Sequence, residues 1–248
     1  MAGYSFYGVP TSEGALGKNK GCEEAPDFLA KLFGVKAENF ELGRGVEKQH
    51  TQILGHAERV IKKKSFFIGG THDITFPLFK AFAKAHKNPS LLIFDAHADS
   101  DQGTKVPSHE DFVRALVEQK IVAPENVLIV GLRKIYPSEK KFLGESGVRF
   151  ILEETIHEFP QSAKELVSQF VGLAENLYVS FDVDVLSEKI MHATHYRPKG
   201  GLTEPEAKIL LEAALPKAEA IDLVEFNPKN MKKKEGKLIL KLFGVFLK

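Results

Sequence analysis

Leu91-Leu92-Ile93-Phe94-Asp95-Ala96-His97-Ala98-Asp99 joins a wholly apolar run to three ligand-type side chains that are separated by alanines. A short, continuous apolar run is typical of a strand that is buried on both faces, as in a parallel sheet. If the backbone stays extended past Phe94, successive side chains alternate, and Asp95, His97 and Asp99 project to one side. The stretch therefore predicts a buried strand that ends in a row of metal ligands.

Two carboxylates and an imidazole at the end of a buried strand are strongly destabilising unless a cation meets them, because desolvating an unpaired charge costs free energy. A divalent metal ion would supply that cation. For this stretch taken alone, an Asp-rich capping loop without a metal is the alternative interpretation, since a single short motif discriminates weakly.

Further apolar runs alternate with helical patterns along the whole chain. We expect strands at residues 5–10, 65–70, 91–94, 126–132, 148–152, 176–181 and 220–228, with helices of ordinary length between them, one of which is a mostly polar helix at 48–64. This alternation predicts the α/β class, a three-layer α/β/α sandwich around a mostly parallel sheet. Because no composition break or low-complexity linker interrupts the chain, one domain over residues 1–248 is expected.

Composition and charge exclude several classes of function. The chain has 34 Lys and Arg residues against 33 Asp and Glu, so no overall field marks a nucleic-acid partner. No stretch approaches the roughly 20 apolar residues of a transmembrane helix, and no secretory signal is visible. Cys22 is the single cysteine, which fits a reducing compartment. We expect a soluble, cytoplasmic protein with neither a nucleic acid nor a membrane as partner.

Charged and imidazole side chains recur at the carboxyl ends of the expected strands, where open α/β sheets bind their ligands. Six of them are candidate metal ligands: His72, Asp95, His97, Asp99, Asp182 and Asp184. Four carboxylates and two imidazoles without a thiolate favour Mn²⁺ over a structural zinc. The four negative charges also match two divalent ions, and a metal pair can present a bridging hydroxide to an electrophilic carbon.

In combination, these motifs resemble those of the ureohydrolase family, which includes arginase, agmatinase and formiminoglutamase. The family's metal motifs and its late Glu-x-Asn-Pro motif correspond here to Gly69-Gly70-Thr71-His72, Asp95-Ala96-His97-Ala98-Asp99, Ser180-Phe181-Asp182-Val183-Asp184 and Glu225-Phe226-Asn227-Pro228. Further matches near both ends extend the resemblance over essentially the whole chain. It implies an arginase-like fold, two Mn²⁺ per subunit, and hydrolysis of a C–N bond in a linear amidine.

The resemblance also implies a role for each site residue. One manganese would be held by His72 and Asp99 and the other by His97 and Asp184, while Asp95 and Asp182 would bridge the pair. Glu225 would face the planar cationic group of the substrate, which suits a carboxylate meeting a guanidinium. His109 would shuttle protons as a general acid and base. A homo-oligomer, either a trimer or a hexamer, is implied as well.

Departures from the arginase pattern bear on the substrate. Where arginases carry two acids after a Gly-Leu-Arg segment, this chain has Lys134 and Tyr136, so the partner of an α-amino group is missing and L-arginine itself is disfavoured. We expect substrate contacts at Arg133, Tyr136 and Glu225, and Arg133, Lys134 or Arg197 could reach an additional carboxylate. The expected reaction converts a guanidino compound to urea and an amine. A formiminoglutamase-type reaction that releases formamide is the alternative.

Two other classes of function stay open on the sequence alone. A deacetylase of the same general fold would use one zinc ion and a pair of adjacent histidines, and the sequence contains no His-His pair. A catalytically idle metal-binding protein is disfavoured by the six ligands but kept open by the altered substrate loops. Outside the motifs, His50 is expected on the surface of its polar helix. Asp222 is expected either to support a metal ligand through a hydrogen bond or to be a buried carboxylate whose hydrogen bonds are satisfied.

Overall fold

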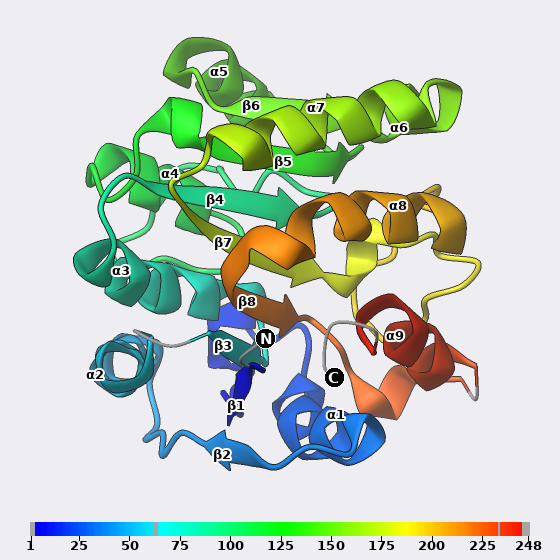
Figure 1. The fold of residues 1–248 in the computed structure, drawn as a ribbon. Coiled ribbons are helices and arrows are strands. Elements are labelled where there is room, and N and C mark those ends of the chain that lie inside the picture. The colour runs from blue at the N-terminus through cyan, green and yellow to red at the C-terminus, as the bar shows by residue number, and fades with distance from the viewer. Residues whose placement is uncertain (1–2, 62–63, 233, 245–248) are drawn as a thin grey trace.

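The computed structural model describes residues 3–61, 64–232 and 234–244. Its centre is a sheet of eight strands in the order β2-β1-β3-β8-β7-β4-β5-β6, in which every pair of neighbours is parallel (Figure 1). The strands are β1 (Ser5–Gly8), β2 (Ala37–Asn39), β3 (Ser65–Ile68), β4 (Pro89–Phe94), β5 (Val127–Leu132), β6 (Arg149–Leu152), β7 (Asn176–Asp182) and β8 (Ala218–Val224). The predicted α/β class with a parallel sheet is confirmed.

Helices cover both faces of this sheet, which confirms the predicted three layers (Figure 1). One face carries α1 (Ala25–Phe33), α6 (Glu153–Glu158), α7 (Pro160–Leu173), α8 (Glu204–Ala214) and α9 (Glu235–Phe243). The other face carries α2 (Val46–Val60), α3 (Thr75–Ala85), α4 (Phe112–Glu118) and α5 (Pro137–Ser146). Within the described ranges, no helix combines the length and apolarity needed to cross a membrane.

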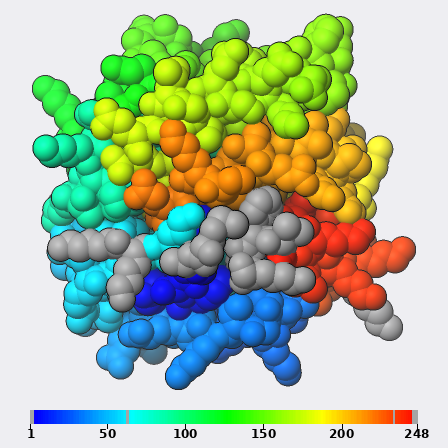
Figure 2. Space-filling model, in the orientation of Figure 1, coloured from blue at the N-terminus to red at the C-terminus, as the bar shows by residue number. Residues whose placement is uncertain are grey.

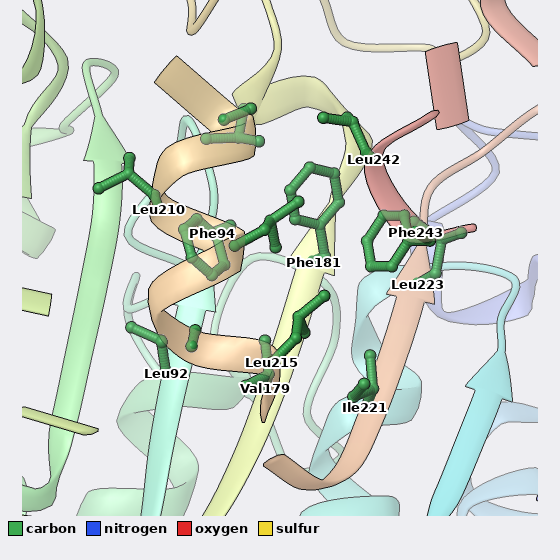
Figure 3. Packing of buried hydrophobic residues seen from close by; sticks show 14 of the residues in the cluster. Leu92, Phe94, Val179, Phe181, Leu210, Leu215, Ile221, Leu223, Leu242 and Phe243 are labelled. Carbon is green, nitrogen blue, oxygen red and sulfur yellow. The ribbon is translucent and has the colours of Figure 1, made fainter. Parts of the chain in front are cut away.

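The apolar run of β4 is continuous because both of its faces are buried. Leu92 and Phe94 belong to the core beneath α7, α8 and α9, whereas Leu91 and Ile93 belong to the core beneath α3 and α4. On the first face, Phe94 lies beside Phe181 of β7, with ring centroids 5.6 Å apart (Figure 3). In the space-filling view, the side chains of α7 and α8 close over the middle of this face (Figure 2). Burial on both faces therefore explains why the sequence revealed this strand.

Four adjacent strands in the middle of the sheet position the site. In the order β3-β8-β7-β4 they are parallel, so their carboxyl ends lie at the same edge. His72 follows β3, the Asp95–Asp99 segment follows β4, Asp182 ends β7, and Glu225 follows β8. Motifs that are far apart in the sequence are thereby brought to one place, as expected for ligand sites in such sheets.

Several local expectations differ from the structure. Strand β2 and the short helix α6 were not predicted, and α2 covers Val46–Val60 rather than 48–64, of which residues 62–63 lie outside the described residues. Strand β8 ends at Val224, because Glu225 has a φ of +60° and leaves the extended conformation. The backbone after Phe94 is also not extended throughout, since Asp99 has a φ of +46°.

Candidate functional site

The loops after β3, β4, β7 and β8 meet at a pocket of about 290 Å³. Five of the six predicted metal ligands line it, and Asp95 lies directly beneath them, with 1% of its surface exposed. Predicted site residues that line the pocket are His72, His97, Asp99, His109, Tyr136, Asp182, Asp184 and Glu225. The structure thus brings together residues that span more than half of the chain.

Asp95 is the centre of the ligand cluster. Its Oδ2 lies 2.8 Å from His72 Nδ1, and its Oδ1 lies 3.4 Å from His97 Nδ1. Two groups of possible ligand atoms share it, one with His72 and Asp182 and the other with His97 and Asp184. Within each group the atoms lie within 4.8 Å of one another. Two adjoining groups with a common carboxylate have the composition that two neighbouring metal ions require.

The orientation of His72 is set by a hydrogen-bond chain from its far side. His72 Nε2 lies 2.9 Å from Ser180 Oγ, and that hydroxyl donates to Asp222 Oδ1 at 2.5 Å. Because the hydroxyl proton is used on Asp222, Nε2 carries the proton of the His72–Ser180 bond, and Nδ1 faces the carboxylates. Among the described residues, buried His72 Nδ1 and Asp95 Oδ2 lack a hydrogen-bond partner. A proton or a metal cation must therefore lie between them.

The carboxylates of the cluster carry more charge than its histidines can neutralise. Burial raises the pKa of Asp182 well above its usual value, and the nearby Asp184 and Asp95 raise it further. Burial, followed by the charge of Asp95, raises the pKa of Asp99 to about 7. Burial lowers the pKa of His72, but the surrounding carboxylates outweigh this and hold that pKa well above its usual value. Divalent cations would relieve this excess of negative charge, so the donor set fits metal ions.

Replacing Ser180 with alanine is expected to lower the affinity for Mn²⁺ about 10- to 100-fold, the usual effect of removing a hydrogen bond that orients a ligand histidine. The substitution leaves His72 Nε2 without its acceptor and removes one of the hydrogen bonds that the Asp222 carboxylate accepts, while those from Thr75 and Tyr178 remain. Calorimetric titration of metal-free protein with Mn²⁺ measures the effect. Ser90→Ala is the matched control, because Ser90 is a buried serine near the amino end of β4. Equal affinities in Ser180→Ala and wild type would contradict the orienting role.

Glu225 lies beside the metal cluster and is held by two hydrogen bonds to its carboxylate. Oε1 accepts from the backbone N–H of His72 at 2.8 Å, and Oε2 accepts from Asn19 Nδ2 at 2.6 Å. Burial raises the pKa of Glu225, but His109, Asn19 and the His72 N–H outweigh it, so that the pKa lies below its usual value. An ionised, buried carboxylate with a fixed orientation is suited to a planar cation in the pocket.

His109 reaches the same pocket from the loop before α4. Its Nδ1 lies 3.5 Å from Glu225 Oε1, while its buried Nε2 has no hydrogen-bond partner within the described part of the chain. Asp111 fixes this loop by accepting hydrogen bonds from the Ser108 backbone N–H and hydroxyl at 2.6 and 2.7 Å. Burial lowers the pKa of His109, but Glu225 outweighs it and raises the pKa above its usual value. His109 can therefore hold a proton beside the pocket.

Comparison with known proteins agrees with this geometry. A model of the Arginase family matches residues 2–243. The chain belongs to the Arginase family. Among curated relatives of this arginase-family protein, an agmatinase of Blochmanniella floridana is 28% identical over 208 residues, which are 82% of this chain and 66% of the relative. An arginase of Staphylococcus aureus strain MRSA252 is 24% identical over 80% of this chain and 74% of its own length. The match thus spans about two thirds of the agmatinase relative.

Solved structures show the same fold. An arginase from Bacillus subtilis superposes with a TM-score of 0.89 at 20% identity, covering 100% of this chain and 99% of that one. A formimidoylglutamase from Bacillus subtilis gives a TM-score of 0.88 at 17% identity, covering 100% and 86% of the two chains. These likenesses confirm the arginase-like architecture of this family member.

Arg133, for which the sequence suggested a substrate contact, also makes contacts within the protein, and its contact with a substrate stays a prediction. In this arginase-family chain its guanidinium donates to the backbone carbonyls of Asp184 and Val185 at 2.5 and 3.3 Å, and its Nε lies 3.7 Å from Glu153 Oε2. Because both hydrogen bonds go to carbonyl groups of the segment that carries Asp184, we infer that Arg133 helps to hold this segment in place. Lys134 is exposed at the rim.

Two residues at or beside the site were missed or misjudged. Asn19 lies in an N-terminal loop with no pattern around it, and only its tertiary contact with Glu225 reveals its role. His50 was expected on the surface, which is wrong: it is 7% exposed, and its Nε2 lies 2.8 Å from Asp73 Oδ2. The reason is that α2 turns His50 toward the loop that carries His72. Asp222 is fully buried, as expected.

Proposed function

We propose that this protein is a binuclear manganese hydrolase that cleaves a C–N bond of a linear amidine, with a guanidino substrate that yields urea and an amine. The observation that carries the proposal is the pair of ligand groups that share Asp95, next to the ionised Glu225 in one pocket. In the proposed site, His72 and Asp99 would hold one ion, His97 and Asp184 would hold the other, and Asp95 and Asp182 would contribute to both. The oxygen-rich donor set suits Mn²⁺.

Each side chain around the proposed metal pair has a separate task. When bound, the metal pair supplies an activated hydroxide. Glu225 accepts hydrogen bonds from the N–H groups of the planar cation and fixes its orientation, because its own carboxylate is held by His72 N–H and Asn19. His109 donates a proton from Nε2 to the leaving nitrogen as the C–N bond breaks. Proteins of the Arginase family are hydrolases of such bonds, which supports this reaction class.

A substrate panel tests the proposal. Manganese-loaded protein is incubated with L-arginine, agmatine, 3-guanidinopropionate, 4-guanidinobutyrate and N-formimino-L-glutamate, and urea and formamide are measured. We expect urea from at least one guanidino compound and little from L-arginine. The reason is that Lys134 and Tyr136 stand where arginases carry two acids that include the partner of the substrate's α-amino group. Formamide without urea would instead indicate the formiminoglutamase-type reaction. No product from protein that holds two manganese ions would contradict hydrolysis and favour the idle metal-binding alternative.

Asn19→Ala is expected to lower kcat/KM about tenfold for the guanidino substrate, because a hydrogen bond to a charged group contributes about 1.5 kcal/mol. The substitution frees one oxygen of Glu225 without touching the metal ligands. Initial rates measure the effect, together with an Mn²⁺ titration that should not change. Asn39→Ala is the matched control, because Asn39 Nδ2 also donates to a carboxylate, that of Asp27, but at the surface. A similar loss in both variants would refute the positioning role.

Three further expectations stay predictions. We propose that residues 1–248 form one domain, which the single eight-stranded sheet supports. We also propose a cytoplasmic enzyme, which the single buried cysteine, Cys22, supports. The trimer or hexamer implied by the family resemblance is tested by measuring the mass of the protein in solution with light scattering.

A further inference from the structure

A second pocket, of about 350 Å³, adjoins the metal pocket. The two share the lining residues His97, Tyr136 and Tyr196. The remaining lining of the second pocket consists of Arg133, Lys134, Arg197, Pro198 and Lys199. Four of these five side chains are cationic, and no Asp or Glu of the described residues lines the pocket. We call it the basic pocket.

The charge of the basic pocket is opposite to that of the metal pocket. The metal pocket is lined by the carboxylates of its ligands and by Glu225, which face the cationic end of an amidine. Past the shared residues His97 and Tyr136, the charged lining residues change from mostly acidic in the metal pocket to basic in the second pocket. Because opposite potentials favour opposite charges, a ligand that spans both pockets fits best with a cation at one end and an anion at the other.

Lys134 is fixed at the junction of the two pockets by its backbone. Its N–H donates to the carbonyl of Ala96 at 2.9 Å, and the residue forms a parallel bridge with His97. The Lys134 Nζ lies 5.1 Å from the centre of the Tyr136 ring. The lysine is therefore anchored directly beside a predicted metal ligand, while its side chain stays at the pocket.

The cations of the basic pocket differ in whether they are already engaged. Arg133 is held by carbonyl groups and lies near Glu153. In contrast, Lys134, Arg197 and Lys199 form no ion pair with any carboxylate of the described ranges. Lys18, which lines the metal pocket near Tyr196, is paired with Glu110, with Nζ and Oε1 2.5 Å apart. Of the Lys and Arg residues that line the two pockets, those without a carboxylate partner thus line the basic pocket.

We propose that the basic pocket binds the carboxylate end of the substrate, with Lys134 and Arg197 as its anchors, so that the substrate is an ω-guanidino carboxylate. The inference rests on the proposed function, which places the amidine end of the substrate in the metal pocket. A tail that ends in an ammonium group would meet like charges here, and an uncharged tail would leave the cations without a partner. The basic pocket therefore favours substrates whose tail ends in a carboxylate.

Three guanidines that differ in the tail test this proposal: 4-guanidinobutyrate, agmatine and butylguanidine, with carboxylate, ammonium and methyl ends. Wild-type protein loaded with manganese is expected to prefer 4-guanidinobutyrate by kcat/KM. In the double variant Lys134→Ala/Arg197→Ala, the ratio of kcat/KM for 4-guanidinobutyrate to that for butylguanidine is expected to fall about fivefold or more, chiefly because KM for 4-guanidinobutyrate rises. In wild type, a higher salt concentration should lower the same ratio, because salt screens the attraction between the carboxylate and the cations. Arg59→Ala/Lys141→Ala is the matched control, because it removes the same charge from exposed helix positions outside both pockets.

The outcomes separate this inference from the proposed function. An equal preference for all three tails in wild type, or an unchanged preference in the double variant, would overturn the basic pocket as a carboxylate site and leave amidine hydrolysis standing. If no compound is hydrolysed, the proposed function fails. The dissociation constants of the same three compounds are then measured by calorimetry on wild type and the double variant. Tighter binding of 4-guanidinobutyrate than of butylguanidine in wild type, reduced in the double variant, would support the carboxylate site, and equal binding would overturn it.

Discussion

Asp95→Ala is expected to lower kcat/KM by at least about 10³-fold and to remove the stabilisation of the fold by Mn²⁺. Asp95 belongs to both groups of ligand atoms, so its loss weakens both proposed metal positions at once. Metal ions supply several kcal/mol of transition-state stabilisation, and each 1.4 kcal/mol corresponds to about tenfold in rate. Initial rates of urea release and the shift of Tm with added Mn²⁺ measure the two effects.

A carboxylate from the same pocket provides the control for Asp95→Ala. Asp101 lines the metal pocket but belongs to neither ligand group, and its Oδ1 bonds Ser138 Oγ and the Gln102 N–H. In Asp101→Ala we expect the Mn²⁺-dependent shift of Tm to match that of wild type. If Mn²⁺ raised the Tm of wild type and Asp95→Ala equally, or of neither, the cluster would not be a metal site.

His109→Asn is expected to lower kcat about 10²-fold, the lower end of what a general acid and base contributes, while the affinity for Mn²⁺ is retained. The pKa of His109 is raised above its usual value by Glu225, so the protonated form is present at neutral pH. As the pH rises through this pKa, the proton that the leaving nitrogen needs is lost, and kcat should fall. The pH profile of kcat measures this, and the alkaline limb due to His109 should be absent in the variant.

The exposed His195 offers a control for the loss of an imidazole near the pocket, because it lines neither pocket. His195→Asn should leave kcat and its pH profile close to wild type. A kcat in His109→Asn within about twofold of wild type would show that another group transfers the proton.

The sequence was sufficient to predict those strands whose burial on both faces produces a continuous apolar run. The runs at β4 and β5 are apolar throughout because both faces of each strand are covered, and this pattern identified them. β2 left no such pattern: Ala37–Asn39 is a short, largely exposed strand that exists through backbone pairing with β1 at the edge of the sheet. The amino-acid composition of a segment does not predict a strand that forms mainly through backbone hydrogen bonds with a neighbouring strand.

Within the site, the predictable part is the part that lies in local motifs. The six candidate ligands could be proposed from the sequence because each lies in a short motif at or after the end of a strand, and the parallel sheet brings those motifs together. Asn19 acts through a contact with Glu225, more than 200 positions away, and no local pattern encodes that contact. Ser180 lies within a quoted motif, but its hydrogen bond to His72 joins two motifs and was not visible in either one. The contacts of Arg133 with backbone carbonyls were likewise not predictable, because no sequence pattern shows which carbonyl groups a guanidinium reaches.

The manganese content of the purified protein, measured by mass spectrometry after dialysis from excess Mn²⁺, tests the central claim most directly. Two neighbouring groups of possible ligands, with the Asp95 carboxylate common to both, predict two ions per chain in wild type and fewer than one in Asp95→Ala. A content near zero in folded wild-type protein would contradict the binuclear manganese centre on which the proposed hydrolysis depends.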